Sequence, residues 1–207
     1  MNIINTLGAF SAEFLRALRN FKYELTDNGV LFTAQKAEVG GVFGHQLIRA
    51  GEAGPWQLDP NKLPTQGLIH LLWTALGGGA QSSAFYLAPF SGNVTPSAAW
   101  TAANFPATAT EFTSYTAAAR LPWTTPTVEI ATASLGNSNA VAASTMEFDS
   151  TGASYTVYGA ALLSASAKSS TSGKLIAASR FGTARTGMVP GDKLALEYVI
   201  TATDASA

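Results

Sequence analysis

Short runs of β-forming residues, separated by turn residues, fill the chain from residue 111 onward, and they restrict the fold more than any other feature. The strands expected there are 126–132, 141–148, 155–163, 174–181 and 193–203. In the last run, Leu194, Leu196 and Tyr198 fall on one face of the strand. Lys193 and Glu197 fall on the other face, as in a sheet that packs on one side. This spacing predicts a mainly β fold, an antiparallel β-sandwich or jelly-roll-like domain.

The middle of the chain adds a helix to this β pattern. Residues 66–76 are apolar almost all round, Thr65 can cap their start, and three consecutive glycines follow them. A helix that is apolar on every side is typical of a buried position, so we expect one buried helix within the β domain. The other elements expected before residue 111 are strands at 42–48 and 83–90, a loop over 51–64 and a short helical turn around Trp100.

The first 62 residues hold nearly half of the charged side chains and form a separate region by composition. Their pattern predicts an amphipathic helix at 11–19 and then a β-hairpin around Asn28-Gly29. We therefore divide the chain into an N-terminal helical and hairpin extension, 1–62, and a β-sandwich domain, 63–207, that contains helix 66–76. A short helix with an apolar stripe needs a partner surface, so we expect the extension to be the docking element. The candidate interface residues are Phe14, Leu18, Phe21, Tyr23 and Phe32.

Charge is scarce in the rest of the chain. Only 12% of the residues are charged, whereas a soluble domain averages roughly 25%, and residues 63–110 contain no Asp, Glu, Lys or Arg. A surface of Ala, Ser, Thr and Gly is better suited to contact with protein neighbours than to keeping a free monomer in solution. The composition thus predicts a component of an assembly. A homo-oligomer is expected, and a trimer is preferred over a dimer.

The composition also argues against several classes of partner. The formal net charge of -1 provides no cluster of positive charge for a phosphate backbone, so no nucleic acid is expected. The most apolar run, 68–76, is far shorter than the roughly 20 residues that a membrane helix needs, so no membrane partner is expected. Without Cys there is neither a disulfide nor a thiolate metal site. The N-terminal residues do not resemble a signal peptide, and no export is expected.

Motifs for catalysis or cofactor binding are weak throughout. His45 and His70 have no second ligand at helical spacing, and the nucleophile motif G-x-S-x-G does not occur. The sequence Ser172-Gly173-Lys174 resembles only the end of a phosphate loop, because Leu175 stands where Ser or Thr would bind magnesium. We therefore expect no enzyme, no cofactor and no metal site.

Two further sets of residues leave open an alternative function in glycan cleavage or glycan binding. The carboxylates Glu129, Glu147 and Asp149 suffice in number for glycoside cleavage, although exposed strand and turn carboxylates are the simpler interpretation. The tryptophans could stack on sugar rings, but core or interface anchoring is the interpretation preferred here. The four are Trp56, Trp73, Trp100 and Trp123.

Several segments together resemble a family of small structural proteins from tailed-bacteriophage virions. They are the Gly67-Leu68-Ile69-His70-Leu71-Leu72 helix, the break at Gly77-Gly78-Gly79, the Phe85-Tyr86-Leu87 strand, the segments 111–115 and 119–123, the hairpin region 148–158, and Val189-Pro190-Gly191-Asp192. The resemblance covers about residues 65–204. It implies an accessory protein on the head or tail of a virion, assembled in the host cytoplasm, and it assigns no catalytic residue.

The resulting hypothesis is a capsid decoration or cement protein that stabilises a phage head by bridging major capsid subunits. One alternative is a tail or fibre-base structural protein, which would bind tail proteins instead. An alternative of a different class is a glycan-binding receptor module. The copy number per virion separates the first two, and soaking with host glycans tests the third.

Overall fold

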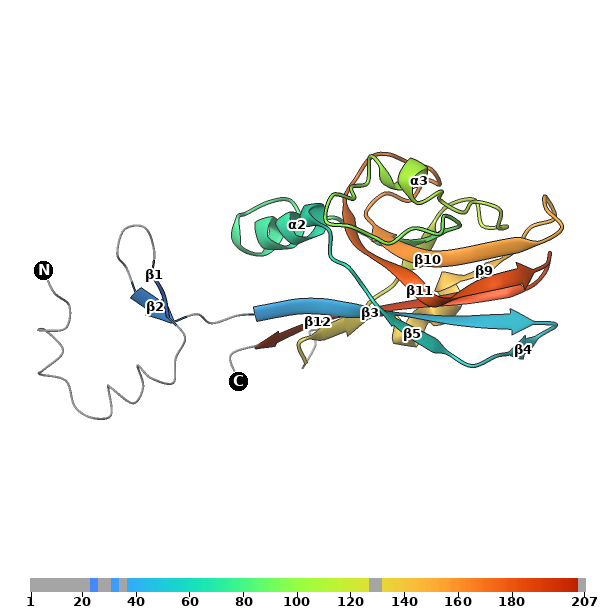
Figure 1. Cartoon of the computed structure of the whole chain (residues 1–207), viewed down its shortest axis with the longest axis horizontal. Helices are drawn as coiled ribbons and strands as arrows, with labels where there is room; N and C mark the ends of the chain where they lie inside the picture. Colours follow the sequence, from blue (N-terminus) through green and yellow to red (C-terminus); the bar gives the residue numbers. More distant parts are fainter. Residues whose placement is uncertain (1–22, 26–30, 34–36, 127–131, 205–207) are drawn as a thin grey trace, which may run out of the picture. The chain divides into compact units, whose positions relative to one another are not determined.

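The described part of the chain is mainly antiparallel β-structure, with two larger sheets, a two-stranded pair and few helices (Figure 1). The computed structural model describes residues 23–25, 31–33, 37–126 and 132–204. The chain divides into two compact units, Met1–Glu38 with Thr203–Ala207, and Val39–Ala202. In the first unit β1 (Tyr23–Leu25) pairs antiparallel with β2 (Leu31–Thr33). These two strands confirm the hairpin predicted around Asn28-Gly29.

The second unit contains a four-stranded sheet in which every neighbouring pair is antiparallel. Its strand order is β11 (Leu175–Met188), β10 (Tyr155–Leu163), β6 (Phe85–Phe90) and β7 (Leu121–Trp123). The register of β10 against β11 shifts between Tyr155 and Val157, between Val157 and Gly159, and between Leu162 and Leu163. Such bulges bend a strand and increase its twist.

The other sheet has six strands and is organised around two long ones. The order along its path is β4 (Glu52–Ala53), β3 (Ala37–Arg49), β12 (Lys193–Asp204) and β8 (Ser134–Gly136). Two short strands complete it, because β5 (Gln57–Pro60) pairs with β3 and β9 (Thr145–Glu147) pairs with β12. The sheet therefore joins residues from both ends of the second unit.

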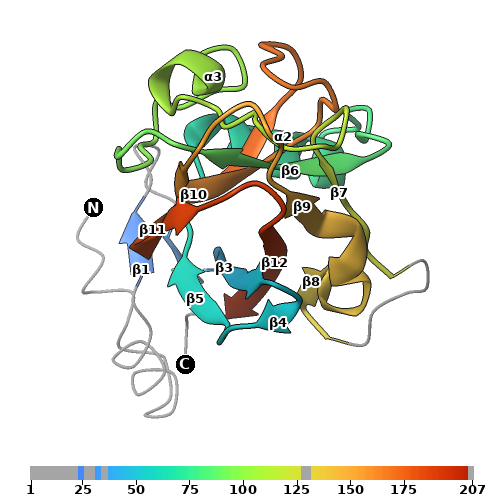
Figure 2. The same ribbon diagram turned by 90° about the vertical axis from the view of Figure 1, so that its right-hand side faces the viewer.

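Alternating residues of β10 separate two hydrophobic clusters. Ala160 and Leu162 pack with Phe43, Tyr198 and other side chains from both sheets in the larger cluster. The next residues in line, Ala161 and Leu163, pack in a second cluster with Phe90, Trp100 and Phe105. Successive side chains of a strand point to opposite faces, so the four-stranded sheet is buried on both sides. Figure 2 shows α3 (Phe105–Thr108) on the side of this sheet that faces away from β3 and β12.

Helix α2 (Thr65–Leu76) is where the structure departs furthest from expectation. Its bounds confirm the predicted helix, but the prediction that it is buried is wrong, because only Gly67 and His70 are buried. The helix lies at the end of the second unit where β12 finishes, and not between the sheets (Figure 1). Its N-cap is Pro64, without a side-chain cap, so Thr65 is not the capping residue.

Several boundaries also differ from the sequence-based predictions. The expected loop 51–64 contains β4 and β5, and β3 and β5 pair within the six-stranded sheet, so the second unit begins well before residue 63. The expected strand 141–148 is a 3-10 helix, η3 (Ser138–Ser144), followed by β9. The helical turn expected near Trp100 occurs instead at α3. The helix expected at 11–19 and most of the strand expected at 126–132 lie outside the described residues.

Candidate interaction surface

Five large apolar side chains project from one face of α2 and form what we call the α2 ridge. Its members, with the exposed fraction of each, are Leu68 (40%), Ile69 (61%), Leu72 (62%), Trp73 (60%) and Leu76 (85%). Scattered exposed apolar residues are ordinary, whereas a contiguous row on one element marks a site of contact with another molecule. The ridge is therefore the strongest candidate for a functional surface in the described part of the chain.

The opposite face of α2 is fixed to the second unit by close contacts. At Gly67 the helix approaches β11 so closely that a Cβ there would come within 2.2 Å of the Ile176 carbonyl oxygen. The Gln66 side-chain oxygen accepts hydrogen bonds from the backbone N–H groups of Ala102 and Leu175, each at 2.8 Å. These bonds tie the helix to β11 and to the loop before α3. The ridge is thus displayed on a rigidly held helix.

Trp73 is the aromatic residue of the ridge, and the glycines after the helix determine how it lies. A Cβ on Gly77 would come within 2.3 Å of the indole, and a Cβ on Gly79 within 1.9 Å of its Cδ1 atom. Gly78 has a φ of 71°, a left-handed conformation that favours glycine, and the Gly79 N–H donates to the Trp73 carbonyl oxygen. The glycine run thus both ends the helix, as predicted, and folds back onto the exposed indole.

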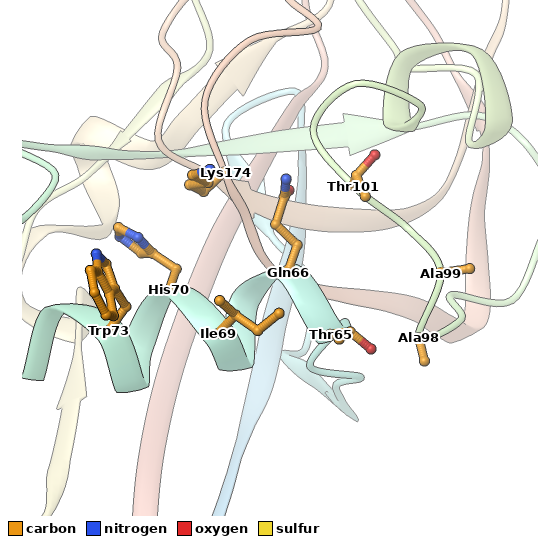
Figure 3. Close-up of a pocket in the computed structure, with 9 residues that line it drawn as sticks. All are labelled: Thr65, Gln66, Ile69, His70, Trp73, Ala98, Ala99, Thr101 and Lys174. Atoms are coloured by element: carbon orange, nitrogen blue, oxygen red, sulfur yellow. The ribbon is translucent and has the colours of Figure 1, made fainter. Parts of the chain in front are cut away.

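A pocket of about 680 Å³ flanks the ridge on the side of Ile69 and Trp73, and we call it the Trp73 pocket. Figure 3 shows Gln66, His70 and Trp73 rising from α2 along it, with Lys174 near them and Ala98, Ala99 and Thr101 at its other end. Lys174 alone carries a formal charge among the described residues that line it. The pocket therefore offers an apolar floor with one cationic group.

A second hollow lies on the other flank of the ridge, and we call it the β8 groove. It has a volume of about 400 Å³ and runs between Leu71, Leu72 and Ala75 of α2 and the ends of β8 and β12. Its remaining lining is almost entirely apolar: Val39, Ala133, Ser134, Leu135, Ile200, Thr201 and Ala202. The ridge is thus bordered by hollows on both sides, as a surface that receives protein side chains would be.

His70 lies beneath the ridge and shares a hydrogen bond with the Ser82 hydroxyl, at 3.2 Å from Nε2. Burial lowers the pKa of His70 from its ordinary value, and the nearby positive charge of Lys174 lowers it further. The imidazole is thus neutral at neutral pH. It serves as a hydrogen-bonded support for the helix.

His45, the other histidine, belongs to a separate buried cluster. Its Nε2 lies 2.9 Å from Asp59 Oδ2, and its ring stacks on Phe181 with centroids 3.7 Å apart. Burial, and then the Arg185 guanidinium, lower the pKa of His45 to about 4, against the opposing effect of Asp59. Since the two histidines have different partners, the structure does not bring them together as a metal pair.

Of the three carboxylates considered for glycoside cleavage, the two that the structure describes have separate partners. Glu147 pairs with Lys193 at 3.2 Å across the β9–β12 ladder. Asp149 accepts hydrogen bonds from the Thr151 N–H and the Tyr155 hydroxyl, and the Thr151 bonds lower its pKa. Glu129 lies outside the described residues. Within that part of the chain, no three His, Cys, Asp or Glu side chains are grouped as a metal site requires.

The remaining candidates have structural positions. Gly173, in the phosphate-loop-like segment, has a φ of 84° in the turn that leads into β11. Trp100 is buried beside Phe105, and Trp123 donates to the Tyr198 carbonyl oxygen. Trp56 is partly exposed, at 39%. Of the four tryptophans, Trp73 alone therefore lies on the ridge.

Two of the five predicted interface residues fall within the described part of the chain. Tyr23 lies on β1 and Phe32 on β2, where Phe32 is paired with Glu24. Phe14, Leu18 and Phe21 lie outside it. The α2 ridge was not predicted from the sequence, because a helix that is apolar on all sides fits a buried helix and a partner-covered helix equally well. The absence of charge over residues 63–110 was the signal that favoured the second interpretation.

No helix in the described ranges combines the length and the apolarity needed to cross a membrane. Comparisons with protein-family models, with curated proteins and with solved structures found no match to this chain.

Proposed function

We propose that this protein is a structural component of a tailed-phage virion, a decoration or cement protein that binds major capsid subunits on the head. We also propose that its two antiparallel sheets form a β-sandwich domain, with α2 as its contact element. The single observation that carries the proposal is the α2 ridge, whose five apolar side chains are 40–85% exposed in a chain with little charge. The resemblance of residues 65–204 to virion structural proteins supports a place on the phage head or tail, of which we propose the head.

The ridge supports an assembly role through the free energy of its burial. Covering a large apolar side chain contributes about 1.5–3 kcal/mol relative to leaving it in water. Five such side chains on one face are therefore a substantial driving force for association. Two flanking hollows increase the surface that a partner can cover.

Stabilisation of a head by this protein follows from mass action. A protein that binds assembled capsid subunits, and not the dissociated ones, adds RT ln(1 + [L]/Kd) of free energy at each occupied site. The candidate residues of the N-terminal extension, Phe14, Leu18, Phe21, Tyr23 and Phe32, remain the proposed contacts with the capsid subunits. The α2 ridge adds a contact surface outside that extension.

The experiment uses purified heads that lack this protein. Adding the full chain should saturate at a copy number proportional to the major capsid protein, and it should raise the temperature at which the heads release DNA. Gold-labelled protein found on tails would move the proposal to the tail or fibre-base alternative. Failure to bind any part of the particle, together with binding to host glycans, would replace it with a receptor module.

A further inference from the structure

The α2 ridge is broader than the contact stripe of an ordinary helix pair. At 3.6 residues per turn, its five members span an arc of roughly 140° around the helix axis. Leu68 and Trp73 lie at the two edges of this arc, and Leu72, Leu76 and Ile69 fall between them. The seam of a two-stranded contact uses only two positions in seven and is narrower. One partner helix would leave an edge of the ridge exposed, so two neighbours are needed to cover it.

The two flanks of the ridge differ in shape, and this difference allows a contact between unlike flanks. On one side Trp73 and Ile69 border a pocket of about 680 Å³. On the other side Leu72 lines the smaller β8 groove, of about 400 Å³, and Leu68 lies at the same edge of the arc. A contact between unlike flanks is heterologous, and repeated heterologous contacts form a closed ring when the rotation permits. Three copies suffice for each ridge to contact two neighbours.

The charge pattern makes a second copy a suitable occupant. No Asp, Glu, Lys or Arg occurs from residue 63 to residue 110, which includes all of α2 and its flanking loops. Identical surfaces can thus approach one another without burying an unpaired charge or placing like charges together. Lys174 carries the formal charge among the described residues that line the Trp73 pocket, and it is exposed.

Trp73 has the features of an interface anchor. Its indole is exposed by 60%, and it lies against Gly77 and Gly79 so closely that neither position has room for a Cβ. An exposed aromatic side chain that is already held in one orientation loses little freedom on binding. Tryptophan is also among the residues that most often dominate the energy of an interface.

We infer that three copies of this chain associate through α2 around a three-fold axis, with Leu68 and Leu72 of each copy seated against Trp73 and Ile69 of the next. This trimer rests on the proposed function, and it deepens that function by naming a second copy as the partner of the α2 ridge.

The test is the oligomeric state of the full chain, measured by analytical ultracentrifugation over a range of concentrations. The parent protein should sediment as a trimer. Leu72→Lys should be monomeric under the same conditions, its half-dissociation concentration raised by on the order of 100-fold. The matched control is Leu58→Lys, because Leu58 on β5 is 68% exposed and is not part of the ridge. The control should remain trimeric, and circular dichroism should show that both variants are folded.

A cross-linking experiment tests the arrangement directly, since the chain contains no cysteine. Leu76→Cys places a single thiol near the middle of the arc, where three copies converge, and mild oxidation should yield a covalent dimer. Leu58→Cys should remain uncross-linked. A monomeric or dimeric parent protein, or a Leu72→Lys variant that is still trimeric, would overturn the inference.

Failure of this inference can be distinguished from failure of the proposed function. A protein that binds heads as a monomer retains the function and loses the trimer. Conversely, if the protein is a trimer that binds no part of the particle, the trimer inference stands and the proposed virion role is wrong.

Discussion

Arg185 donates a hydrogen bond from Nε to Nδ1 of His45 at 2.8 Å, so the imidazole of this fully buried residue must accept at Nδ1 and carry its proton on Nε2. Asp59 accepts on the other side, with Oδ2 at 2.9 Å, and Phe181 covers the ring. A second proton on His45 would break the bond with Arg185 and place two positive charges together. The folded state therefore holds this histidine neutral.

This arrangement predicts a loss of stability in mild acid. The pKa of His45 falls from 6.5 in the unfolded chain to about 4 in the folded one, so the unfolded state binds more protons between those values. The free energy of unfolding is therefore highest, as far as this histidine is concerned, above pH 6.5. It falls by about 3 kcal/mol in total as the pH falls toward 4. Urea unfolding at pH 7, 5.5 and 4.5 measures it. His45→Gln should show a flatter profile, and parallel profiles would contradict the prediction.

The buried ion pair between Arg120 and Glu111 predicts an asymmetric mutational effect. Arg120 Nη2 lies 2.7 Å from Glu111 Oε2, and the guanidinium also donates to the carbonyl oxygens of Ala165 and Ser170. Arg120→Met leaves a buried carboxylate unpaired and should lower the free energy of unfolding by about 3–5 kcal/mol.

Two further variants serve as controls for this prediction. Removing both charges, with Arg120→Met and Glu111→Leu together, should cost less than Arg120→Met alone. The exposed pair of Lys193 with Glu147 is the matched control, and Lys193→Met should cost under about 1 kcal/mol. Chemical denaturation of the three variants provides the comparison. A double variant less stable than Arg120→Met alone would show that the desolvated carboxylate is not the source of the loss.

The contact of Trp73 with Gly79 predicts a change at the surface with little change in the fold. Gly79→Ala inserts a methyl group where only 1.9 Å separates the Cβ position from Trp73 Cδ1, so the indole must move. Trimer formation and head binding should weaken roughly 10-fold or more, since an interface anchor is displaced. Gly40→Ala is the control, because nothing lies within 4 Å of its Cβ position. Equal sedimentation of both variants would be evidence against a role for the indole.

The N-terminal extension predicts a separate loss of particle binding. Phe14→Ala in the full chain should weaken occupancy on heads by about 2 kcal/mol per copy, the effect of truncating an aromatic anchor at a packed interface. The trimer should persist, since α2 is unchanged. Occupancy on heads that lack the protein, measured beside Leu58→Lys, provides the test. An unchanged affinity would direct the search for the capsid contact to the second unit.

Local patterns in the sequence were sufficient to predict many elements of the fold. The bounds of β10 agree with the predicted strand 155–163, and β12 follows the alternation of Leu194, Leu196 and Tyr198. β12 has a clear alternation, and turn residues precede both strands. The hairpin of β1 and β2 was likewise predicted from the short-range signal at Asn28-Gly29.

Features that depend on tertiary context were not predictable from those patterns. The prolines in residues 51–64 indicated a loop, yet Pro60 lies at the end of β5 and pairs with Val42. The apolar run from Val141 forms η3, where the Thr145 hydroxyl donates to the Val141 carbonyl oxygen. For α2, burial depends on which surfaces reach the helix, and composition does not contain that information. The α2 ridge and its flanking hollows therefore became visible only with the structure.

The register shifts between β10 and β11 affect whether a strand of another molecule can add to the edge of this sheet. β11 is the last strand of its sheet, and an open, flat edge strand invites another chain to add to it. Here the strand is bent by bulges, and Lys62 pairs with Ala178 across part of its free edge. Adding a strand along its whole length is thus blocked. At this edge, neighbouring copies are therefore kept from joining their sheets into a continuous, amyloid-like stack of strands.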